Sequence, residues 1–410
     1  MTNTFLHGVE VIELTSGART ISTPASAVIG LVGTAPSADP AAFPLDTPVL
    51  ITSPSQAAAL TKNLPDNPEA SDYGSLPDAI AGIYAGAKTP VVIVRVDVTL
   101  TDPIATQLAA VVGVQADQTG CFALLAAQSL CGVKPKILIA PSWTHQDGAA
   151  NTANPVCAAL KTVAGRVRGI VVADGPNDTE AAAAAASTLV GNERLYLVDP
   201  WIKVSSITGA GIDTVPASAD VAGVIANSDQ QRGFWWSPSN QSLPRALGTG
   251  RAIEFSISDT DTESNLLNAA GIATVVNAGA GFLLWGNRTA STDSEWVFLS
   301  VRRTFDMIED AVEMSYLWAM DRPFSAQLLT DVNNELNSYL RSLKARGAIL
   351  GGTAWLDPDL NTANTMKAGQ YYVDFDAEPP APLERLTFQA SRNDGYYDEL
   401  VAAVSSAASN

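Results

Sequence analysis

Continuous apolar runs recur through the first half of the chain, separated by polar and amphipathic stretches. Runs without alternation are typical of strands that lie in a sheet covered on both faces. Their short length and their spacing fit strands better than buried helices. The pattern therefore predicts strands at residues 27–33, 48–52, 91–96, 136–141, 169–174 and 195–200.

Helix-like segments lie between several of these runs, at residues 76–87, 154–163 and 178–190. Ser75 can cap the first helix by accepting from its free N–H groups. Strand–helix–strand units of this length form parallel sheets with right-handed crossovers. We therefore predict an α/β domain over residues 24–285. Residues 97–131 interrupt the alternation and are predicted as a possible insertion.

The pattern changes after Trp285, where two long helices are predicted at residues 301–320 and 326–346. The residue before Pro323 disfavours helical geometry, and Ser325 can cap the second helix. The second helix has one apolar stripe at spacings of three and four residues. The stripe consists of Leu329, Val332, Leu336, Leu340 and Leu343.

Two predicted strands, at residues 370–375 and 383–391, follow these helices. The second strand has a period-two apolar face, and a Pro-rich segment joins the two strands. Together with the helix pair they predict a smaller α+β C-terminal domain over residues 286–395. The remaining residues, 396–410, are predicted to form a C-terminal arm.

The N-terminus also looks like an arm, over residues 1–23. A short strand is predicted there with no partner nearby in the sequence. It either pairs as an ordinary edge strand of the chain's own sheet or joins the sheet edge of a neighbouring chain. The residues of this predicted linking strand are Gly8, Val9, Glu10, Val11, Ile12 and Leu14.

Charge excludes some classes of partner. The chain has 42 acidic and 24 basic residues and a net charge of −18. Nucleic-acid binders need a basic face for phosphate contacts, so DNA or RNA is not an expected partner. Anionic membrane surfaces are excluded for the same reason. We find no apolar stretch long enough to span a membrane and no secretory signal, and we expect folding in a cytoplasm.

Candidate catalytic chemistry is sparse. The two histidines are His7, in the predicted arm, and His145, in a polar loop after a predicted strand. Neither position suits a rigidly held general base, and no GxSxG motif is present. The three cysteines, Cys121, Cys131 and Cys157, lack CxxC spacing and are predicted to be reduced core residues. The chain is therefore not expected to be an enzyme.

Cofactor and metal motifs are also weak, and we expect no cofactor. Gly30 and Gly33 lie in a predicted strand outside any GxGxxG or P-loop context, so close packing is the better interpretation. Asp259, Asp261 and Glu263 resemble the start of a calcium loop, but its sixth position lacks glycine, which favours a solvated loop. The Trp235–Trp236 pair fits core or subunit-interface packing better than carbohydrate binding.

An ordered set of short motifs resembles one known family. The chain is similar to the tail sheath proteins of contractile phages, R-type pyocins and related injection particles. The resemblance covers nearly the whole chain, and its specificity comes from the order of the motifs. They are residues 7–11, 17–23, 27–35, 266–272, 285–289, 302 onward, 367–369 and 383–386.

The resemblance implies a fold, a function and a set of partners. The α/β domain would be an outer, subtilisin-like domain without protease chemistry, and the C-terminal domain would face an inner tail tube. Copies of the chain would stack as hexameric rings around the tube and contract to drive it through a target envelope. Further implied partners are baseplate and tail terminator proteins. The location would be the virion tail, assembled in the host bacterial cytoplasm.

Tube contact has three candidate residues at the end of the second C-terminal helix. Arg341, Lys344 and Arg346 could meet acidic groups on the tube, since the C-terminal domain is implied to face inward. Basic residues at a helix end also favour the helix dipole when they are simply exposed to solvent. Both interpretations stay open from the sequence.

Two other classes of function compete with a sheath subunit. An α/β hydrolase-like enzyme would need a nucleophile and a base, which we do not find in the sequence. Another self-assembling virion component, such as a tube protein, would be expected to be shorter and richer in β-structure.

Overall fold

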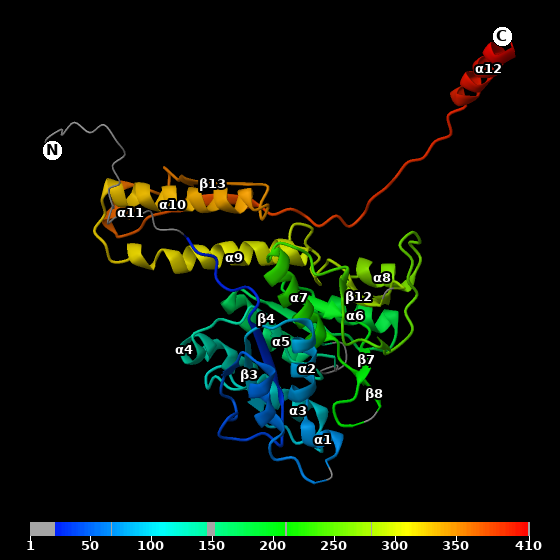
Figure 1. The fold of residues 1–410 in the computed structure, drawn as a ribbon. Helices are drawn as coiled ribbons and strands as arrows, with labels where there is room; N and C mark the ends of the chain where they lie inside the picture. Colours follow the sequence, from blue (N-terminus) through cyan, green and yellow to red (C-terminus); the bar gives the residue numbers. More distant parts are fainter. Residues whose placement is uncertain (1–20, 67, 146–151, 210, 280, 409–410) are drawn as a thin grey trace, which may run out of the picture.

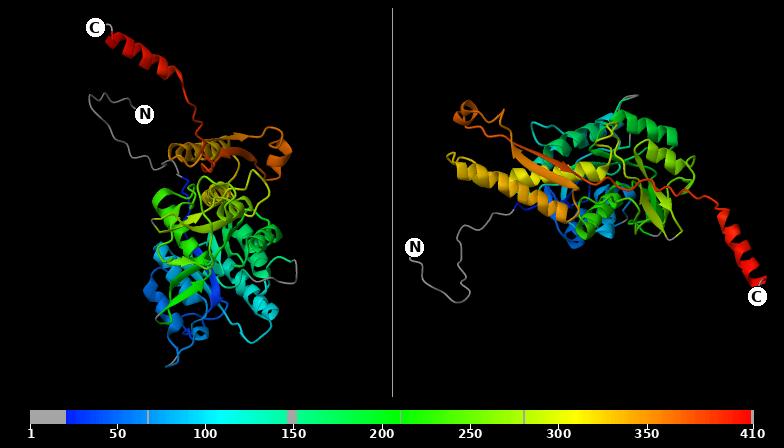
Figure 2. Two further views of the ribbon diagram at one scale, coloured as in Figure 1. Left: turned by 90° about the vertical axis from the view of Figure 1, so that its right-hand side faces the viewer. Right: turned by 90° about the horizontal axis from the view of Figure 1, so that it is seen from above.

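The computed structural model describes residues 21–66, 68–145, 152–209, 211–279 and 281–408. An α/β body carries a long, flat unit of two helices and a hairpin on top (Figure 1). The chain leaves this unit as an extended segment and ends in a helix that stands away from the body (Figures 1 and 2).

The body is built on a sheet in which nine of the described strands pair in the order β2-β3-β1-β4-β5-β6-β11-β12-β9. The central strands run parallel, while β2, β12 and β9 make antiparallel pairs near the edges. The bounds are β1 Ile29–Thr34, β2 Val49–Ile51, β3 Val91–Val96, β4 Ile137–Ile139, β5 Ile170–Asp174, β6 Leu195–Val198, β9 Gln241–Ser242, β11 Ile272–Asn277 and β12 Phe282–Trp285. The first six confirm the strands predicted from the apolar runs, except that β2 is antiparallel.

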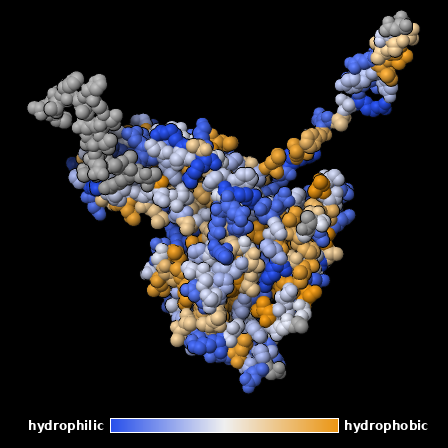
Figure 3. Space-filling model, in the orientation of Figure 1, coloured by the Kyte–Doolittle hydropathy of each residue, from blue (hydrophilic) through white to orange (hydrophobic). Residues whose placement is uncertain are grey.

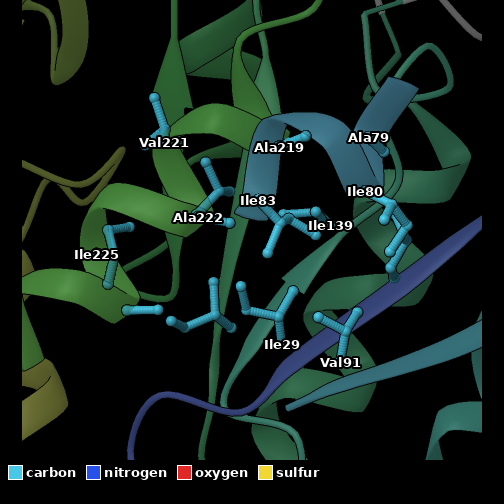
Figure 4. Close-up of a cluster of buried hydrophobic side chains, with 14 of the residues drawn as sticks. Ile29, Ala79, Ile80, Ile83, Val91, Ile139, Ala219, Val221, Ala222 and Ile225 are labelled. Atoms are coloured by element: carbon cyan, nitrogen blue, oxygen red, sulfur yellow. The ribbon is translucent and has the colours of Figure 1, made fainter. Parts of the chain in front are cut away.

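One face of the sheet is covered by α2 (Leu76–Gly86) and α7 (Ser218–Arg232). Their apolar side chains pack on Ile29, Val91 and Ile139 of the sheet (Figure 4). The two helices approach very closely, since a Cβ on Gly223 would lie 2.6 Å from the Ile83 carbonyl oxygen. Glycine is thus required at this crossing.

The other face has its own core, which the helices α3 (Ile104–Val112), α5 (Pro155–Val167) and α6 (Glu180–Val190) cover. Residues 97–131 fold into α3, η2 (Gly120–Ala126) and α4 (Ala127–Cys131). Leu108, Val111 and Leu124 from this segment are buried against the sheet residues Val32 and Val92. The segment therefore completes the second core.

Further elements of the body lie outside these layers. A small sheet joins β7 (Ile202–Ser205) to β8 (Ile212–Val215) and β10 (Gly248–Thr249). The remaining short elements are η1 Pro54–Thr61, α1 Ala70–Tyr73 and α8 Glu263–Ala269. In the part of the chain that the structure describes, no helix is both long and apolar enough to cross a membrane.

The upper unit has a third core of its own. Its elements are α9 Leu299–Ser315, η3 Leu317–Ala319, α10 Ala326–Ala345, β13 Gly351–Leu356, α11 Ala363–Lys367 and β14 Val373–Glu378. Leu336, Leu340 and Leu343, from the predicted stripe, are buried between α9 and the β13–β14 hairpin, whereas Leu329 and Val332 are only half-buried. The first helix ends at Ser315, earlier than predicted, because η3 and an extended turn precede Pro323.

The prediction of a strand at residues 383–391 is wrong for the single chain, because no strand forms there. Residues 379–394 are extended but pair with no strand among the described residues. The predicted arm at residues 396–410 contains a helix, α12 (Gly395–Ala408), which was not predicted.

Candidate assembly interface

The predicted N-terminal linking strand, Gly8 to Leu14, lies outside the described residues. The described chain begins at the upper unit, where Ile21 is buried in the third core. The hydroxyl groups of Thr23 and Tyr339 share a hydrogen bond of 2.9 Å. The described chain therefore begins beside α10.

The structure extends the predicted C-terminal arm, residues 396–410, back to residue 379. Its described part, residues 379–408, also leaves from the upper unit and is called the C-terminal arm below. Leu383 and Phe388 expose 77% and 85% of their surface, which is unusual for large apolar side chains. Apolar residues form orange stretches along this arm and on α12 (Figure 3). Exposed apolar groups in a contiguous patch usually mark a surface that binds a partner.

Helix α12 has an apolar stripe at helical spacing. The residues are Tyr396, Tyr397, Leu400, Val401 and Val404, all exposed. The helix has no packing partner among the described residues, because none of its residues is buried. This periodicity is present in the sequence. A search for helical spacing in residues 396–404, which precede the small polar residues at the end of the chain, would have predicted the helix.

The β13–β14 hairpin offers a sheet with open edges. Its register runs from Gly351 opposite Glu378 to Leu356 opposite Val373, and no other described strand extends it. The Asn337 side-chain amide binds the backbone N–H and C=O of Ala354, at 3.0 and 2.8 Å. Those two groups are thus not open to a further strand, whereas no described side chain hydrogen-bonds the backbone of Phe375, which lies opposite Ala354 on β14.

The joint between body and upper unit is ionic and buried. Arg303 of α9 is 4% exposed and donates two hydrogen bonds, of 2.8 and 2.5 Å, to the carboxylate of Asp229 on α7. Arg194 of the body makes the same kind of bidentate pair with Asp306, at 2.6 and 2.7 Å. Bidentate pairs fix orientation as well as distance.

Asp310 makes further ionic contacts across the joint, and Arg168 of the body pairs with Glu309 and Glu313 of α9 beside it. Asp310 of α9 lies 2.6 Å from the buried Lys136 ammonium and 2.9 Å from Lys134. Burial opposes ionisation of Asp310, but the hydrogen bonds from the two lysines outweigh it and leave its pKa below the usual range. Burial lowers the pKa of Lys136 despite the carboxylate. The sequence pattern did not predict that these charged residues of α9 would be buried.

The C-terminal edge of the parallel sheet is where α/β folds usually bind ligands. Here, Asp174 at the end of β5 is buried and accepts from the Ser218 hydroxyl at 2.6 Å and from the Ser218 backbone N–H at 2.8 Å. Burial raises the pKa of Asp174 to about 6. The Ser218 hydroxyl is used as a donor to a carboxylate and is itself buried, so it is not arranged as a nucleophile.

His145 lies at the same edge but does not complete a triad. Its ring packs edge-on against Trp201, with centroids 4.7 Å apart, and its Nδ1 finds no hydrogen-bond partner among the described residues. Burial lowers the pKa of His145 to about 4. The cavity that it shares with Asp174 and Cys157 measures about 30 Å³, which leaves room for little more than one water molecule.

Several weaker motifs take the structural roles expected of them. A Cβ on Gly30 would lie 2.9 Å from Leu138, so this glycine serves close packing. Glu263 pairs with Arg251, and Asp259 accepts from the backbone N–H of Asp261. Cys121 and Cys157 are buried free thiols, whereas Cys131 is only half-buried. No cluster of acidic, histidine or cysteine side chains among the described residues could hold a metal.

The tube-facing candidates lie at the exposed end of α10. Arg341 donates to the Ser338 hydroxyl at 2.8 Å, and the Arg346 guanidinium lies 5.8 Å from the ring centre of Trp235. Lys344 is exposed on the same last turns. Their contact with a tube stays a prediction.

Comparison with known proteins places the whole chain in one family. Residues 74–290 match the model of the phage tail sheath protein central domain, and residues 291–391 match that of the phage tail sheath C-terminal domain. The chain is 37% identical to a prophage major tail sheath protein of Pseudomonas aeruginosa strain UCBPP-PA14, over 97% of this chain and 99% of the relative. It is 32% identical to the tail sheath protein of Escherichia phage P2, over 98% of both chains.

Solved structures of sheath proteins share the fold. The contracted helical sheath of the anti-feeding prophage superposes with a TM-score of 0.69, over 95% of this chain and all of the other, at 20% identity. The contracted sheath complex of the extracellular injection system PVC gives 0.68, over 97% of this chain and all of the other, also at 20% identity. Family models, relatives of nearly equal length and a shared fold lead to one conclusion: this chain belongs to the phage tail sheath protein family.

Proposed function

We propose that this chain is the structural subunit of a contractile tail sheath. Copies polymerise around an inner tail tube, and contraction of the polymer drives the tube through the envelope of a target cell. The observation that carries the proposal is the C-terminal arm, which exposes apolar side chains and unpaired backbone away from its own body. Such a segment gains stability only by binding another chain.

The arms are proposed to link neighbouring copies by strand addition. Residues 1–23 and 396–410, with the extended stretch after Leu383, would form this mesh. The open edge of β14 would receive one donated strand, because main-chain hydrogen bonds need little side-chain specificity. The chain's own edge-strand alternative for Gly8 to Leu14 is less favoured, since the described chain emerges beside the upper unit and not beside the body's sheet.

We assign the remaining parts as follows. Residues 24–285 form the outer domain, with a subtilisin-like arrangement of parallel sheet and covering helices and, among its described residues, no assembled catalytic triad. Residues 286–395 form the inner domain, and Arg341, Lys344 and Arg346 face the tube. Hexameric rings, a baseplate, a tail terminator and assembly in the host cytoplasm belong to the same proposal.

An enzymatic role is the competing proposal, and the geometry favours it less. Ser218 is buried and donates to Asp174, whereas His145 packs on Trp201 and forms no hydrogen bond with either residue in the described part of the chain. Electron microscopy of the purified protein tests the two proposals. We expect hollow cylinders of the width of a contracted sheath. A strictly monomeric protein with hydrolase activity would overturn the sheath proposal.

The N-terminal arm has its own test. A chain that lacks residues 1–16 keeps Ile21 and Thr23, so we expect a folded monomer with an unchanged circular dichroism spectrum. We expect no cylinders from it at concentrations where the full chain forms them. Normal cylinders from the truncated chain would show that residues 8–14 are not a linking strand.

A further inference from the structure

Two of the sequence motifs that resemble the family meet in space, although about a hundred residues separate them. Arg288, just after β12, donates from Nε to both carboxylate oxygens of Glu384, at 3.1 Å each, and from Nη2 to Oε2 at 2.7 Å. Its guanidinium also lies 6.0 Å from the centre of the Phe298 ring. Both partners are partly exposed, with 39% and 32% of their side-chain surface accessible.

Backbone hydrogen bonds fix the position of Arg288. Its backbone pairs with Phe298 in an isolated antiparallel bridge, directly before the start of α9. On either side, Thr289 N–H donates to the Val297 carbonyl at 2.8 Å and Leu299 N–H donates to the Asn287 carbonyl at 3.0 Å. The position of the guanidinium is therefore tied to the body and to the joint.

The arm reaches Glu384 along a stiff path. Leu350 N–H donates to the Glu378 carbonyl at 2.7 Å, which holds the end of β14. Pro379, Pro380 and Pro382 then fix three φ angles within four residues. Beyond Glu384, residues 385–392 make no hydrogen bond to the rest of the described chain.

We propose that the Arg288–Glu384 pair is a clasp that sets the direction in which the C-terminal arm leaves the molecule. The proposal rests on the sheath function, because only a linking arm needs a set direction. The clasp presents the arm to a second copy of the chain in one orientation. Without it, the arm beyond the prolines would sample many orientations and lose them on binding.

A groove beside the clasp is lined in part by the segment of the arm that the clasp holds. It measures about 1160 Å³ and lies between the body, at Trp236 and Trp285, and residues 383–388 of the arm. Release of Glu384 would remove the wall that the arm supplies. A single exposed ion pair contributes little to folding, so the clasp acts on direction and not on the stability of the body.

Distance measurements between spin labels test the direction of the arm. The labels are placed at Ala185→Cys on α6 and Thr387→Cys on the arm, three residues past the clasp, in a Cys131→Ala background at concentrations below assembly. We expect a narrow distribution of label-to-label distances for this parent protein. The single variants Arg288→Glu and Glu384→Arg should each give a distribution at least two-fold broader. The double variant with both charges swapped should give a narrow distribution again. Arg385→Glu, next to the clasp, is the matched control and should stay narrow.

Assembly is measured on the unlabelled variants. A contribution of about 1 kcal/mol per subunit corresponds to a roughly five-fold rise in the concentration needed for cylinders in each single variant. The swap should return it to within about two-fold of the natural chain. Distance distributions of the same width in all variants would overturn the clasp. Broader distributions in the single variants with unchanged assembly would also overturn it. A natural chain that forms no cylinders would instead contradict the sheath function itself.

Discussion

At the scale of single residues, the most consequential feature is the buried charge on α9. Arg302, Arg303, Asp306 and Asp310 are all at most 8% exposed, and each has an oppositely charged partner. Paired buried charges contribute little net stability compared with apolar residues of the same shape. They do penalise any arrangement in which a partner is missing, so they define one relative position of body and upper unit.

Arg303 and Asp229 provide a test of this joint. Arg303→Ala leaves the Asp229 carboxylate buried and unpaired, so we expect it to lower the free energy of unfolding by about 3 kcal/mol. The double variant Arg303→Met, Asp229→Leu should cost clearly less, because no unpaired charge remains. Urea unfolding followed by circular dichroism measures both. Arg385→Ala is the exposed control, and equal losses in the single and double variants would contradict the pairing.

His145 leads to a prediction about pH. Its folded-state pKa of about 4 lies below the ordinary value of 6.5, because burial favours the neutral ring. Its contribution to stability is therefore complete above pH 6.5 and is lost as the pH falls from 6.5 toward 4. His145→Phe keeps the contact with Trp201 and should reduce this loss by about 2 kcal/mol, after allowance for solvent screening.

Thermal unfolding at pH 7 and at pH 4.5 measures the difference. Asp174 acts in the opposite sense, since its raised pKa favours the folded state as the pH falls through about 6 toward 3.8. The comparison must therefore be made between variants and not on the natural chain alone. An NMR titration that gives His145 a pKa near 6.5 would remove the basis of the prediction.

At the scale of elements, helix packing explains why some segments could be predicted and others could not. The apolar runs at β1 and β3 to β6 are buried on both faces, and that burial is visible in the sequence. Helix α7 was not predicted, because it is buried nearly all round and carries Asp220 and Asp229 toward Arg245 and Arg303. From the sequence alone, the charged residues of α7 would be predicted to be exposed, because the sequence does not show their ion-pair partners.

The crossing of α2 and α7 gives a prediction about two glycines. A Cβ at Gly223 would lie 2.6 Å from the Ile83 carbonyl oxygen, whereas a Cβ at Gly165 on α5 would meet nothing within 4 Å. We expect Gly223→Ala to destabilise the protein by about 2 kcal/mol through overpacking. Gly165→Ala should stabilise it by up to about 1 kcal/mol through helix propensity. Chemical denaturation of both variants checks the sign, and a neutral Gly223→Ala would contradict the close crossing.

At the scale of the whole molecule, the proposed linking arms would separate folding from assembly. None of the three cores contains a residue from 379–408, although Pro379 is buried and Glu384 forms a half-exposed ion pair. The cost of exposed apolar surface on the arm is offset only in a polymer. A subunit of this kind can stay linked to its neighbours while its body moves as a rigid unit.

The apolar stripe of α12 tests this separation. Leu400→Glu with Val404→Glu should leave the melting temperature unchanged, because the helix contacts no core, but should reduce cylinder formation at least ten-fold. Ala402→Glu lies off the stripe and is the matched control. Sedimentation of cylinders from monomers measures the effect. Full assembly of the stripe variant would show that α12 is not part of the interface.

The sequence by itself determined the local order of the chain: the buried strands, their covering helices and the amphipathic α10, since periodicity and burial are properties of neighbouring residues. It also contained the ordered motifs that indicated the family, and the comparisons confirmed that family. The predicted linking strand from Gly8 to Leu14 and the tube-facing Arg341, Lys344 and Arg346 stay predictions. Only the tertiary structure revealed the contacts between distant segments, such as Arg303 with Asp229 and Arg288 with Glu384. The residues next to a charged side chain in the sequence do not indicate which distant residue it pairs with. Burial and pairing of this kind are therefore decided by the fold.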